Sequence, residues 1–175
     1  MAWRALGAFA LAELGYPAGD ASLVPLREQA LEWVLSQEYE RRHMGRVRGE
    51  DLPTLHASIE GNLVWSLLRL GLADERIDRL VARLLRAQWS DGGWNCDRRA
   101  SGRVSSFGES VVPLRALNAY TRTTGDSDAR EGVLRASELF LRRRLFRRRT
   151  DDSVIDRAFL ELYFPAIGTT TSCSR

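Results

Sequence analysis

Six arginines gathered around Leu145 form the densest charged group of the sequence. A guanidinium group matches phosphate oxygens in a bidentate way, so this group could bind a diphosphate, an anionic lipid or a nucleic acid. The group also follows a predicted helix, where cations are favoured, and a solvated helix end is therefore the simpler interpretation. Leu145-Phe146 interrupts the run as a packed pair rather than as a series of stacking platforms for a single strand. The six residues are Arg142, Arg143, Arg144, Arg147, Arg148 and Arg149.

Glu60 and Glu109 are the candidates for acid–base chemistry, with Asp97 as a third carboxylate. Both glutamates fall in the first turn of a predicted helix. There the helix dipole stabilises a negative charge, which by itself explains an acidic residue. The sharper alternative is that both side chains belong to one polar group near Cys96 and Asp97. The choice depends on the helices that carry these residues.

Helical periodicity dominates the apolar pattern of the chain. Seven segments place apolar residues on one face at helical spacing, and glycine or proline ends several of them. Pro113 falls within the fifth segment, where it predicts either a kink or the true first turn of the helix. No segment alternates with a period of two, so we predict an all-α fold. The segments are approximately 3–14, 25–34, 58–70, 74–85, 107–120, 127–141 and 154–163.

The predicted helices repeat as pairs. Gly15, Gly71 and Gly125 each separate a first helix from a second, at intervals of 56 and 54 residues. The long segments 38–55 and 89–105 correspond to each other as loops between successive pairs. A helical hairpin cannot bury its apolar face alone, so several hairpins must pack side by side.

Composition limits the classes of function. The 175 residues are 44% hydrophobic and 28% charged, which is enough for one folded domain with a buried core. All 26 basic residues are arginines, yet the net charge is only +3. We attribute this to GC-rich codon usage and expect no nucleic-acid partner. Cys96 and Cys173 are too few for a disulfide framework and indicate a reducing compartment. With no apolar run of about 18 residues and no signal-peptide pattern, we expect a cytoplasmic protein.

The segment 88–94 reads Gln-Trp-Ser-Asp-Gly-Gly-Trp and has the features of a junction between helices. Gln88, at a predicted helix end, can bond free backbone groups of the next element. Asp91, Gly92 and Gly93 predict a tight turn that needs a positive φ. Trp94 is expected to cover the junction and to stack on the Gln88 amide. This segment resembles the QW motif of squalene–hopene cyclases and related α/α-toroid proteins.

The resemblance extends in weaker form from about residue 3 to Pro165. Gly-Gly-Trp-Asn-Cys-Asp at 92–97 and Ser-Ser-Phe at 105–107 are similar to a bacterial group of squalene-cyclase-like and prenyltransferase-like proteins. The resemblance implies that residues 1–166 form part of an α/α toroid, an incomplete ring of about three and a half helix pairs. Residues 167–175 are an irregular tail. We interpret it as a frameshift product, because permitted codons read Trp-His-Tyr-Asp in another frame.

The resemblance can be compared with the chemistry of class II triterpene cyclases. These enzymes protonate an alkene with an Asp-x-Asp-Asp motif whose central acid must be kept protonated. Here only Asp151-Asp152 is present, after Arg149-Thr150. Neighbouring arginines lower the pKa of a carboxyl group, which is the opposite of what the acid needs. We therefore expect no hopene cyclase activity and interpret the pair as a solvated helix start.

Protein prenyltransferases share the toroid and hold a zinc ion through Asp, Cys and His. The residues of matching type here are Cys96, Asp97 and His56, with Glu60 or Glu109 in reserve. Zinc favours thiolate, imidazole and carboxylate ligands in a tetrahedral array. The simpler interpretation of Cys96 is a semi-buried thiol of a loop, because a free cysteine commonly acts as a small apolar side chain.

Two functions remain open from the sequence. The first is a squalene-cyclase-like or prenyltransferase-like protein that handles an isoprenoid or other apolar substrate in the toroid cavity, with peripheral membrane contact. The second is a non-catalytic helical-repeat scaffold, which the missing acid motif favours. An open ring would also expose apolar helix faces and could pair two copies as a homodimer. The aromatic side chains expected either to line a cavity or to fill the core are Trp65, Trp94, Phe107 and Tyr120.

Overall fold

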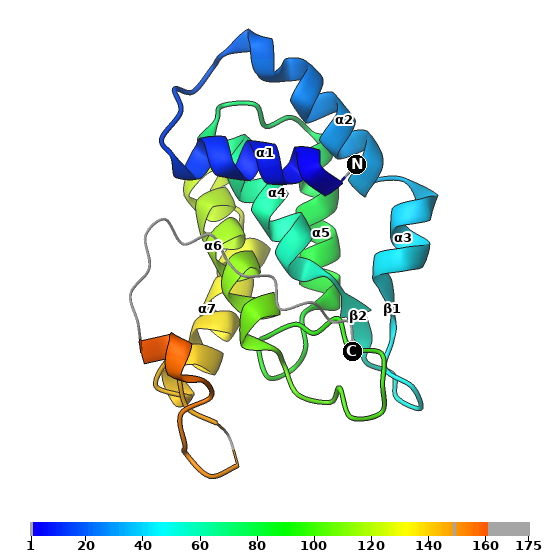
Figure 1. The fold of residues 1–175 in the computed structure, drawn as a ribbon, viewed down its shortest axis with the longest axis vertical. Helices are drawn as coiled ribbons and strands as arrows, with labels where there is room; N and C mark the ends of the chain where they lie inside the picture. Colours follow the sequence, from blue (N-terminus) through cyan, green and yellow to red (C-terminus); the bar gives the residue numbers. More distant parts are fainter. Residues whose placement is uncertain (1, 149, 161–175) are drawn as a thin grey trace.

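The computed structural model describes residues 2–148 and 150–160, and these are mostly helical (Figure 1). The described residues contain two short strands, β1 (Met44–Arg46) and β2 (Pro53–Leu55), and two 3₁₀ helices, η1 (Ala21–Leu23) and η2 (Arg157–Leu160). They also contain seven α-helices: α1 (Ala2–Glu13), α2 (Val24–Val34), α3 (Gln37–His43), α4 (Ala57–Arg69), α5 (Arg76–Ala87), α6 (Phe107–Thr124) and α7 (Ser127–Arg142). None of these described helices is long and apolar enough to cross a membrane.

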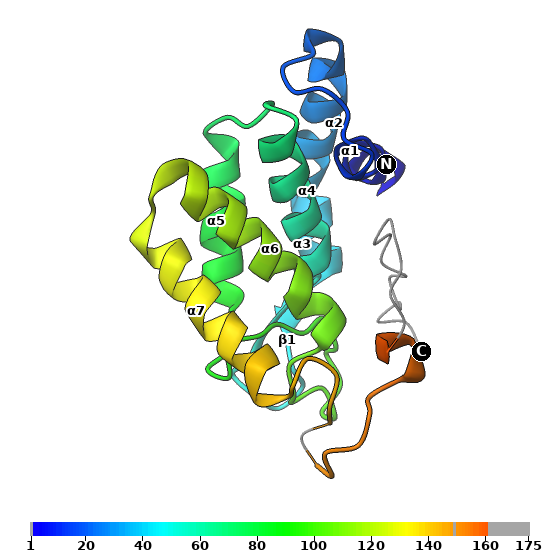
Figure 2. The same cartoon turned by 90° about the vertical axis from the view of Figure 1, so that its left-hand side faces the viewer.

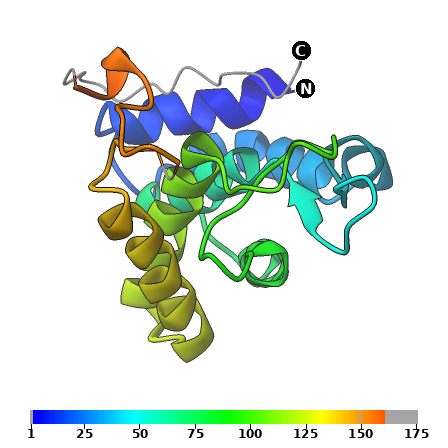
Figure 3. The ribbon, with the colours of Figure 1, turned by 90° about the horizontal axis from the view of Figure 1, so that it is seen from below.

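Six of the helices follow one another as three pairs, α1–α2, α4–α5 and α6–α7. The first helix of each pair packs against the next first helix, so that α4 lies between α1 and α6 (Figure 2). Seen from below, α7 and α3 lie on opposite sides of the arrangement (Figure 3). The order is that of stacked hairpin repeats, as predicted.

The junctions within the pairs share one conformation. Gly15, Gly71 and Gly125 have φ values of 75°, 65° and 76°, in the left-handed region that favours glycine after a helix. The helices that follow two of them begin next to aspartates that bind backbone nitrogens. Asp126 is the N-cap of α7 and accepts a hydrogen bond from the backbone of Ala129, whereas Asp74 precedes the N-cap of α5 and accepts one from the backbone of Arg76. The repeat predicted from glycine spacing is therefore visible in the backbone.

The core is filled by the faces along which the helices meet. Its largest fully buried side chains are mainly leucines of α4, α5 and α6, together with Trp94. α4 and α6 approach each other closely at Gly61, where an added Cβ atom would lie 3.0 Å from the nitrogen of Pro113. Pro113 lies inside α6, which begins at Phe107, so the prediction that it marks the first turn is wrong.

The segment 38–55 differs from the expected loop. It contains most of α3 and an antiparallel hairpin in which Met44 of β1 lies opposite Leu55 of β2. Each strand has only three residues. A period of two cannot be recognised over so short a stretch, and the all-α prediction therefore holds only as mostly α.

The predicted helix from Val154 onward is wrong at its start. Val154 forms an antiparallel bridge with Arg147, and the Arg148 nitrogen donates to the Ser153 oxygen, so this stretch folds back on itself. Helical structure begins at Arg157, as the 3₁₀ helix η2. Residues 161–163 of the predicted helix, and the tail 167–175 with Cys173, lie outside the described residues.

Candidate functional site

The candidate residues gather at one end of the helical pairs, in the lower part of Figure 1. The N-terminal ends of α4 and α6 lie there, with the C-terminal ends of α5 and α7. His56 and Glu60 come from the start of α4, and Glu109 comes from the start of α6. The segment 88–106, which carries the Gln-Trp-Ser-Asp-Gly-Gly-Trp motif, lies at the same end.

Glu60 forms a buried ion pair with Arg83 of α5. The Glu60 residue is 0% exposed, and its two carboxylate oxygens accept hydrogen bonds of 2.7 and 3.2 Å from Arg83. Arg83 also donates to the Val34 carbonyl at 2.8 Å and to Glu40 at 3.2 Å. Burial raises the pKa of Glu60 to about 7, although the Arg83 charge acts in the opposite direction. Arg83 therefore joins α5 to α2, α3 and α4 through one charged group.

Arg83 was missed in the sequence, although a signal was present. It lies on the apolar face of α5 that includes Leu80 and Leu84, both of which are fully buried. A charged residue on such a face needs a partner of opposite charge, because an unpaired buried charge is very costly. Position alone therefore pointed to a buried carboxylate on a neighbouring helix.

Glu109 reaches across from α6 to the first turn of α4. Its carboxylate accepts a hydrogen bond of 2.8 Å from the backbone nitrogen of Ser58. Burial raises the pKa of Glu109, while the Ser58 hydrogen bond and the nearby His56 lower it.

As expected, the Glu109 carboxylate lies at a helix N-terminus, where the helix dipole favours a negative charge. The helix that it binds is the neighbouring α4 rather than its own helix α6. Glu109 therefore contacts the first turn of α4, the helix that carries Glu60. A single polar group that also includes Cys96 and Asp97 stays a prediction.

Three aromatic rings adjoin these carboxylates. Tyr39 stacks on His43 with ring centroids 4.5 Å apart, and His43 meets His56 edge-on at 4.7 Å. Burial, followed by the charge of His56, lowers the pKa of His43 to about 4. Burial and the charge of Glu60 raise the pKa of Tyr39. We call the group Tyr39, His43, His56, Glu60, Arg83 and Glu109 the carboxylate–imidazole cluster.

Two polar atoms of this cluster are buried without a hydrogen-bond partner of good geometry among the described residues. They are the Tyr39 hydroxyl oxygen and Nδ1 of His43. Buried polar atoms are nearly always paired. The Tyr39 hydroxyl interacts with the Glu60 carboxylate and lowers the pKa of Glu60, so Nδ1 of His43 is the clearer exception within this cluster. The cluster combines two carboxyl groups with two imidazoles, and acid–base chemistry needs groups of this kind.

The zinc candidates do not share one place. His56 belongs to the carboxylate–imidazole cluster, whereas Asp97 pairs with Arg99 at 2.9 Å. Hydrogen bonds from Arg99 lower the pKa of Asp97. Cys96 is buried, with 6% of its surface exposed. Within the described part of the chain, no three His, Cys, Asp or Glu side chains are grouped closely enough to hold a metal ion. Zinc binding stays a prediction.

Gln88 of the motif joins two helical pairs. Its side-chain nitrogen donates to the carbonyls of Gly92 and Gly132, at 2.8 and 2.9 Å, and its oxygen accepts from Arg135 at 2.6 Å. Gly132 and Arg135 belong to α7, so Gln88 links the end of α5 to the following pair. The expected bonding of Gln88 to the next element is therefore found.

The rest of the motif forms the turn and its anchor. Gly92 has a φ of 97°, as the tight turn requires, and Asp91 accepts a hydrogen bond of 2.5 Å from the Ser105 hydroxyl. Trp94 is completely buried and donates its indole N–H to the Leu84 carbonyl at 2.8 Å. All of these contacts hold elements together.

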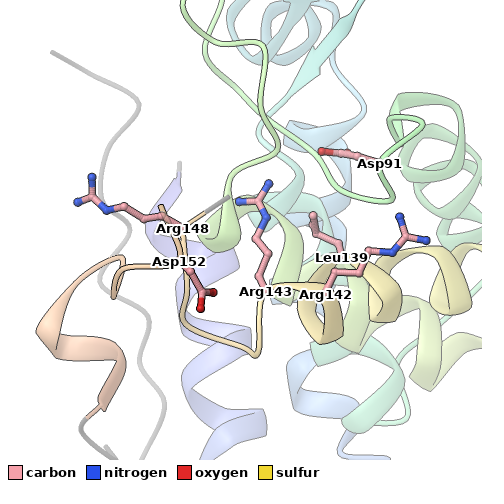
Figure 4. Close-up of a pocket in the computed structure, with 6 residues that line it drawn as sticks. All are labelled: Asp91, Leu139, Arg142, Arg143, Arg148 and Asp152. Carbon is pink, nitrogen blue, oxygen red and sulfur yellow. The ribbon is translucent and has the colours of Figure 1, made fainter. Parts of the chain in front are cut away.

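A second feature at this end is a pocket of about 300 Å³ at the C-terminal end of α7 (Figure 4). Its two carboxylates already have partners, because Asp91 binds Ser105 and Asp152 lies 3.5 Å from Arg147. The lining thus carries three guanidinium groups against two carboxylates, and the three guanidinium groups point in different directions (Figure 4). The lining residues are Asp91, Leu139, Arg142, Arg143, Arg148 and Asp152.

The backbone around this pocket turns sharply. Arg144, Leu145 and Asp152 have positive φ values of 47°, 70° and 56°, a conformation that is uncommon for residues other than glycine and clusters at binding sites. Asp151 does not begin a helix. It accepts hydrogen bonds from Ser153, which lower its pKa, so it is not held as a protonated acid.

The four aromatic candidates divide between core and surface. Trp94, Phe107 and Tyr120 are at most 8% exposed. Phe107 packs edge-on against Phe140, and the Tyr120 hydroxyl donates to Asp78. Trp65 is half-buried, with the guanidinium of Arg115 3.4 Å above its ring. Core packing therefore accounts for three of the four.

The raised pKa of Glu60 predicts a specific pH dependence. The native state holds the Glu60 proton up to about pH 7, whereas the unfolded chain loses it near the ordinary value of 4.5. Between these values the unfolded state binds fewer protons, so stability falls as the pH rises. Relative to Glu60→Gln, the free energy of unfolding should fall by roughly 1 kcal/mol per pH unit in this window.

Urea unfolding of both proteins across this pH range measures the difference. The comparison with Glu60→Gln cancels the contribution of His43, whose lowered pKa makes stability rise between about pH 4 and 6.5. A difference that is constant with pH would mean that Glu60 stays ionised beside Arg83.

The structure thus brings Glu109 to the start of α4, which carries Glu60 and follows His56, whereas Asp97 pairs with Arg99. No protein-family model, curated protein or solved structure matches the chain. The argument for function therefore depends on the geometry of the carboxylate–imidazole cluster and of the arginine-lined pocket.

Proposed function

We propose that this chain is an α/α-toroid-type protein that binds an isoprenoid or similar apolar molecule with a phosphate or diphosphate head group. The observation that carries the proposal is the arginine-lined pocket at the C-terminus of α7. Helix pairs stacked through α1, α4 and α6 support the fold part of the proposal. The QW-like motif supports it independently, because Gln88 joins successive pairs.

The lining of the pocket suits such a ligand. Arg142, Arg143 and Arg148 supply guanidinium groups, which bind phosphate oxygens in a bidentate way. Leu139 supplies an apolar wall, and Leu141 and Leu145 are more than half exposed in the same part of the chain. A volume of about 300 Å³ is at the lower end of ligand pockets, which fits a head group better than a whole prenyl chain.

The carboxylate–imidazole cluster is the acid–base element of this proposal. The first turn of α6 connects the two features, since Phe107 lies 5.2 Å beneath the Arg143 guanidinium and Glu109 follows two residues later. Within the proposal, Glu60 and Glu109 are the candidate proton donors and acceptors. Asp97, held by Arg99, has no role in it.

Replacing arginines of the pocket tests the proposal. Titration calorimetry should detect binding of inorganic pyrophosphate, and the double variant Arg142→Ala, Arg148→Ala should weaken it roughly tenfold or more, since each charge-assisted pair contributes about 1.5 kcal/mol. The matched control is Arg69→Ala, Arg122→Ala, which removes two exposed arginines outside the pocket. Farnesyl diphosphate should bind more tightly than pyrophosphate, and farnesol more weakly than farnesyl diphosphate.

A non-catalytic helical-repeat scaffold is the second candidate. It is favoured by one specific observation: Arg83, Gln88 and Glu109 all form hydrogen bonds between different helices. Absence of pyrophosphate and farnesyl diphosphate binding, or equal loss in the control variant, would exclude the ligand-binding proposal and leave the scaffold.

A further inference from the structure

The arginine pocket contains two carboxylates, although phosphate binding favours positive charge. The two carboxylates are held in different ways. Asp91 accepts a hydrogen bond of 2.5 Å from the Ser105 hydroxyl, within the turn of the motif. The side chain of Asp152 is 63% exposed, and its carboxylate lies 3.5 Å from Arg147 and 3.7 Å from Arg144. Asp91 therefore belongs to the turn, whereas the charge of Asp152 is directed at arginines.

A fold-back of the chain brings Asp152 to these arginines. After α7 the chain turns on itself, with Val154 bridged to Arg147. The Arg147 guanidinium also donates to the Asp152 carbonyl at 2.6 Å. Asp152 has a φ of 56°, a left-handed conformation that aspartate adopts more readily than most residues. In the view of Figure 4, its side chain lies between those of Arg148 and Arg143, which line the same pocket.

The ion pairs of Asp152 are of a kind that a phosphate group can replace. Their separations of 3.5 and 3.7 Å exceed those of hydrogen-bonded ion pairs, and exposed pairs of this geometry are weak. A phosphate group carries more charge than a carboxylate and offers more oxygens to a planar guanidinium. A bound phosphate would therefore take the place of the Asp152 carboxylate beside Arg144 and Arg147.

We propose that Asp152 is an internal counter-ion of the arginine pocket, which the phosphate or diphosphate group of a ligand displaces when it binds. This inference rests on the proposed function and adds to it the residue that limits the affinity. Without a ligand, Asp152 lowers the positive potential of the pocket. Once displaced, it releases Arg144 and Arg147, which do not line the pocket, for contact with the ligand.

Titration calorimetry with inorganic pyrophosphate at low ionic strength tests the proposal. Asp152→Asn removes the charge and keeps the size of the side chain, and asparagine tolerates the same left-handed backbone. This variant should lower the dissociation constant roughly threefold or more, in keeping with the modest strength of exposed ion pairs. A gain in affinity does not result from a damaged fold, so the readout separates a counter-ion from a structural role.

Asp151→Asn is the matched control, because it removes the same charge one residue away. Asp151 lies within reach of the Arg148 charge, but it is bound by Ser153 and does not line the pocket. Its variant should change the dissociation constant by less than about twofold.

The outcomes distinguish this inference from the proposed function. If the unaltered chain binds pyrophosphate and Asp152→Asn binds it no more tightly, or if Asp151→Asn gains as much, the counter-ion is excluded and the proposed function remains. If neither the unaltered chain nor Asp152→Asn binds pyrophosphate, the proposed function fails and this inference fails with it.

Discussion

Replacing Arg83 by methionine should lower the free energy of unfolding by about 3–5 kcal/mol above pH 7, where Glu60 is ionised, because one member of a buried ion pair is then left alone. Arg83 binds Glu60 through two hydrogen bonds and also the Val34 carbonyl. Glu60 is 0% exposed and has no access to water that could replace this partner. Urea unfolding monitored by circular dichroism measures the loss.

Two further variants separate charge from packing. Arg83→Met combined with Glu60→Met should recover most of the stability, since apolar residues of similar volume replace buried ion pairs at little cost. Arg86→Met, at an exposed position of the same helix, should leave stability almost unchanged. The loss in Arg83→Met should also shrink at acidic pH, where Glu60 is protonated. If the double variant is no more stable than Arg83→Met alone, the buried charge is not the cause.

Truncating Trp94 to alanine should cost about 3–5 kcal/mol of stability, the range for large buried aromatic residues. Trp94 is completely buried, and its indole N–H binds the Leu84 carbonyl of α5. Its backbone also pairs with Ser106, immediately before α6. Its removal would therefore leave a cavity between two successive helical pairs and weaken the connection between them.

Matched variants identify the source of this effect. Trp94→Phe keeps most of the buried volume and loses the hydrogen bond, which should cost about 1–3 kcal/mol because the Leu84 carbonyl loses a partner. Trp65→Ala, at the half-buried tryptophan of α4, should cost less than Trp94→Ala. Thermal unfolding of the three variants gives the order. Equal losses at positions 65 and 94 would contradict an anchoring role for Trp94.

Local patterns predicted the helices well where apolar periodicity was long and glycine ended it. Gly15, Gly71 and Gly125 divided the chain correctly, because a left-handed residue after a helix is a property of the local backbone. The helix predicted from Val154 failed, since hydrogen bonds to Phe146 and Arg148 bind that stretch to the preceding strand-like segment. Apolar spacing alone does not report such pairing.

The residue types of the candidate site could be predicted from the sequence. The hydrogen-bond partners of these residues were harder to predict. Glu60 and Glu109 were recognised as first-turn acids, but the bond from Ser58 of α4 to Glu109 of α6 depends on how the two helices pack. The hydrogen bonds between Glu60 and Arg83 join residues 23 apart in the sequence. His43 lies among arginines in the sequence, which gives no sign that it stacks on the buried Tyr39.

The contact between Gly61 and Pro113 has a consequence for how the sequence can vary. At this point the separation of α4 and α6 is set by backbone atoms, because no side chain of residue 61 intervenes. A larger residue at position 61 requires the backbones of α4 and α6 to move apart, because the nearest atoms belong to the backbone of Val112 and Pro113, and no exchange of a side chain at position 113 removes them. In evolutionary terms, we expect position 61 to stay glycine in related sequences, and substitutions to accumulate at the positions around it.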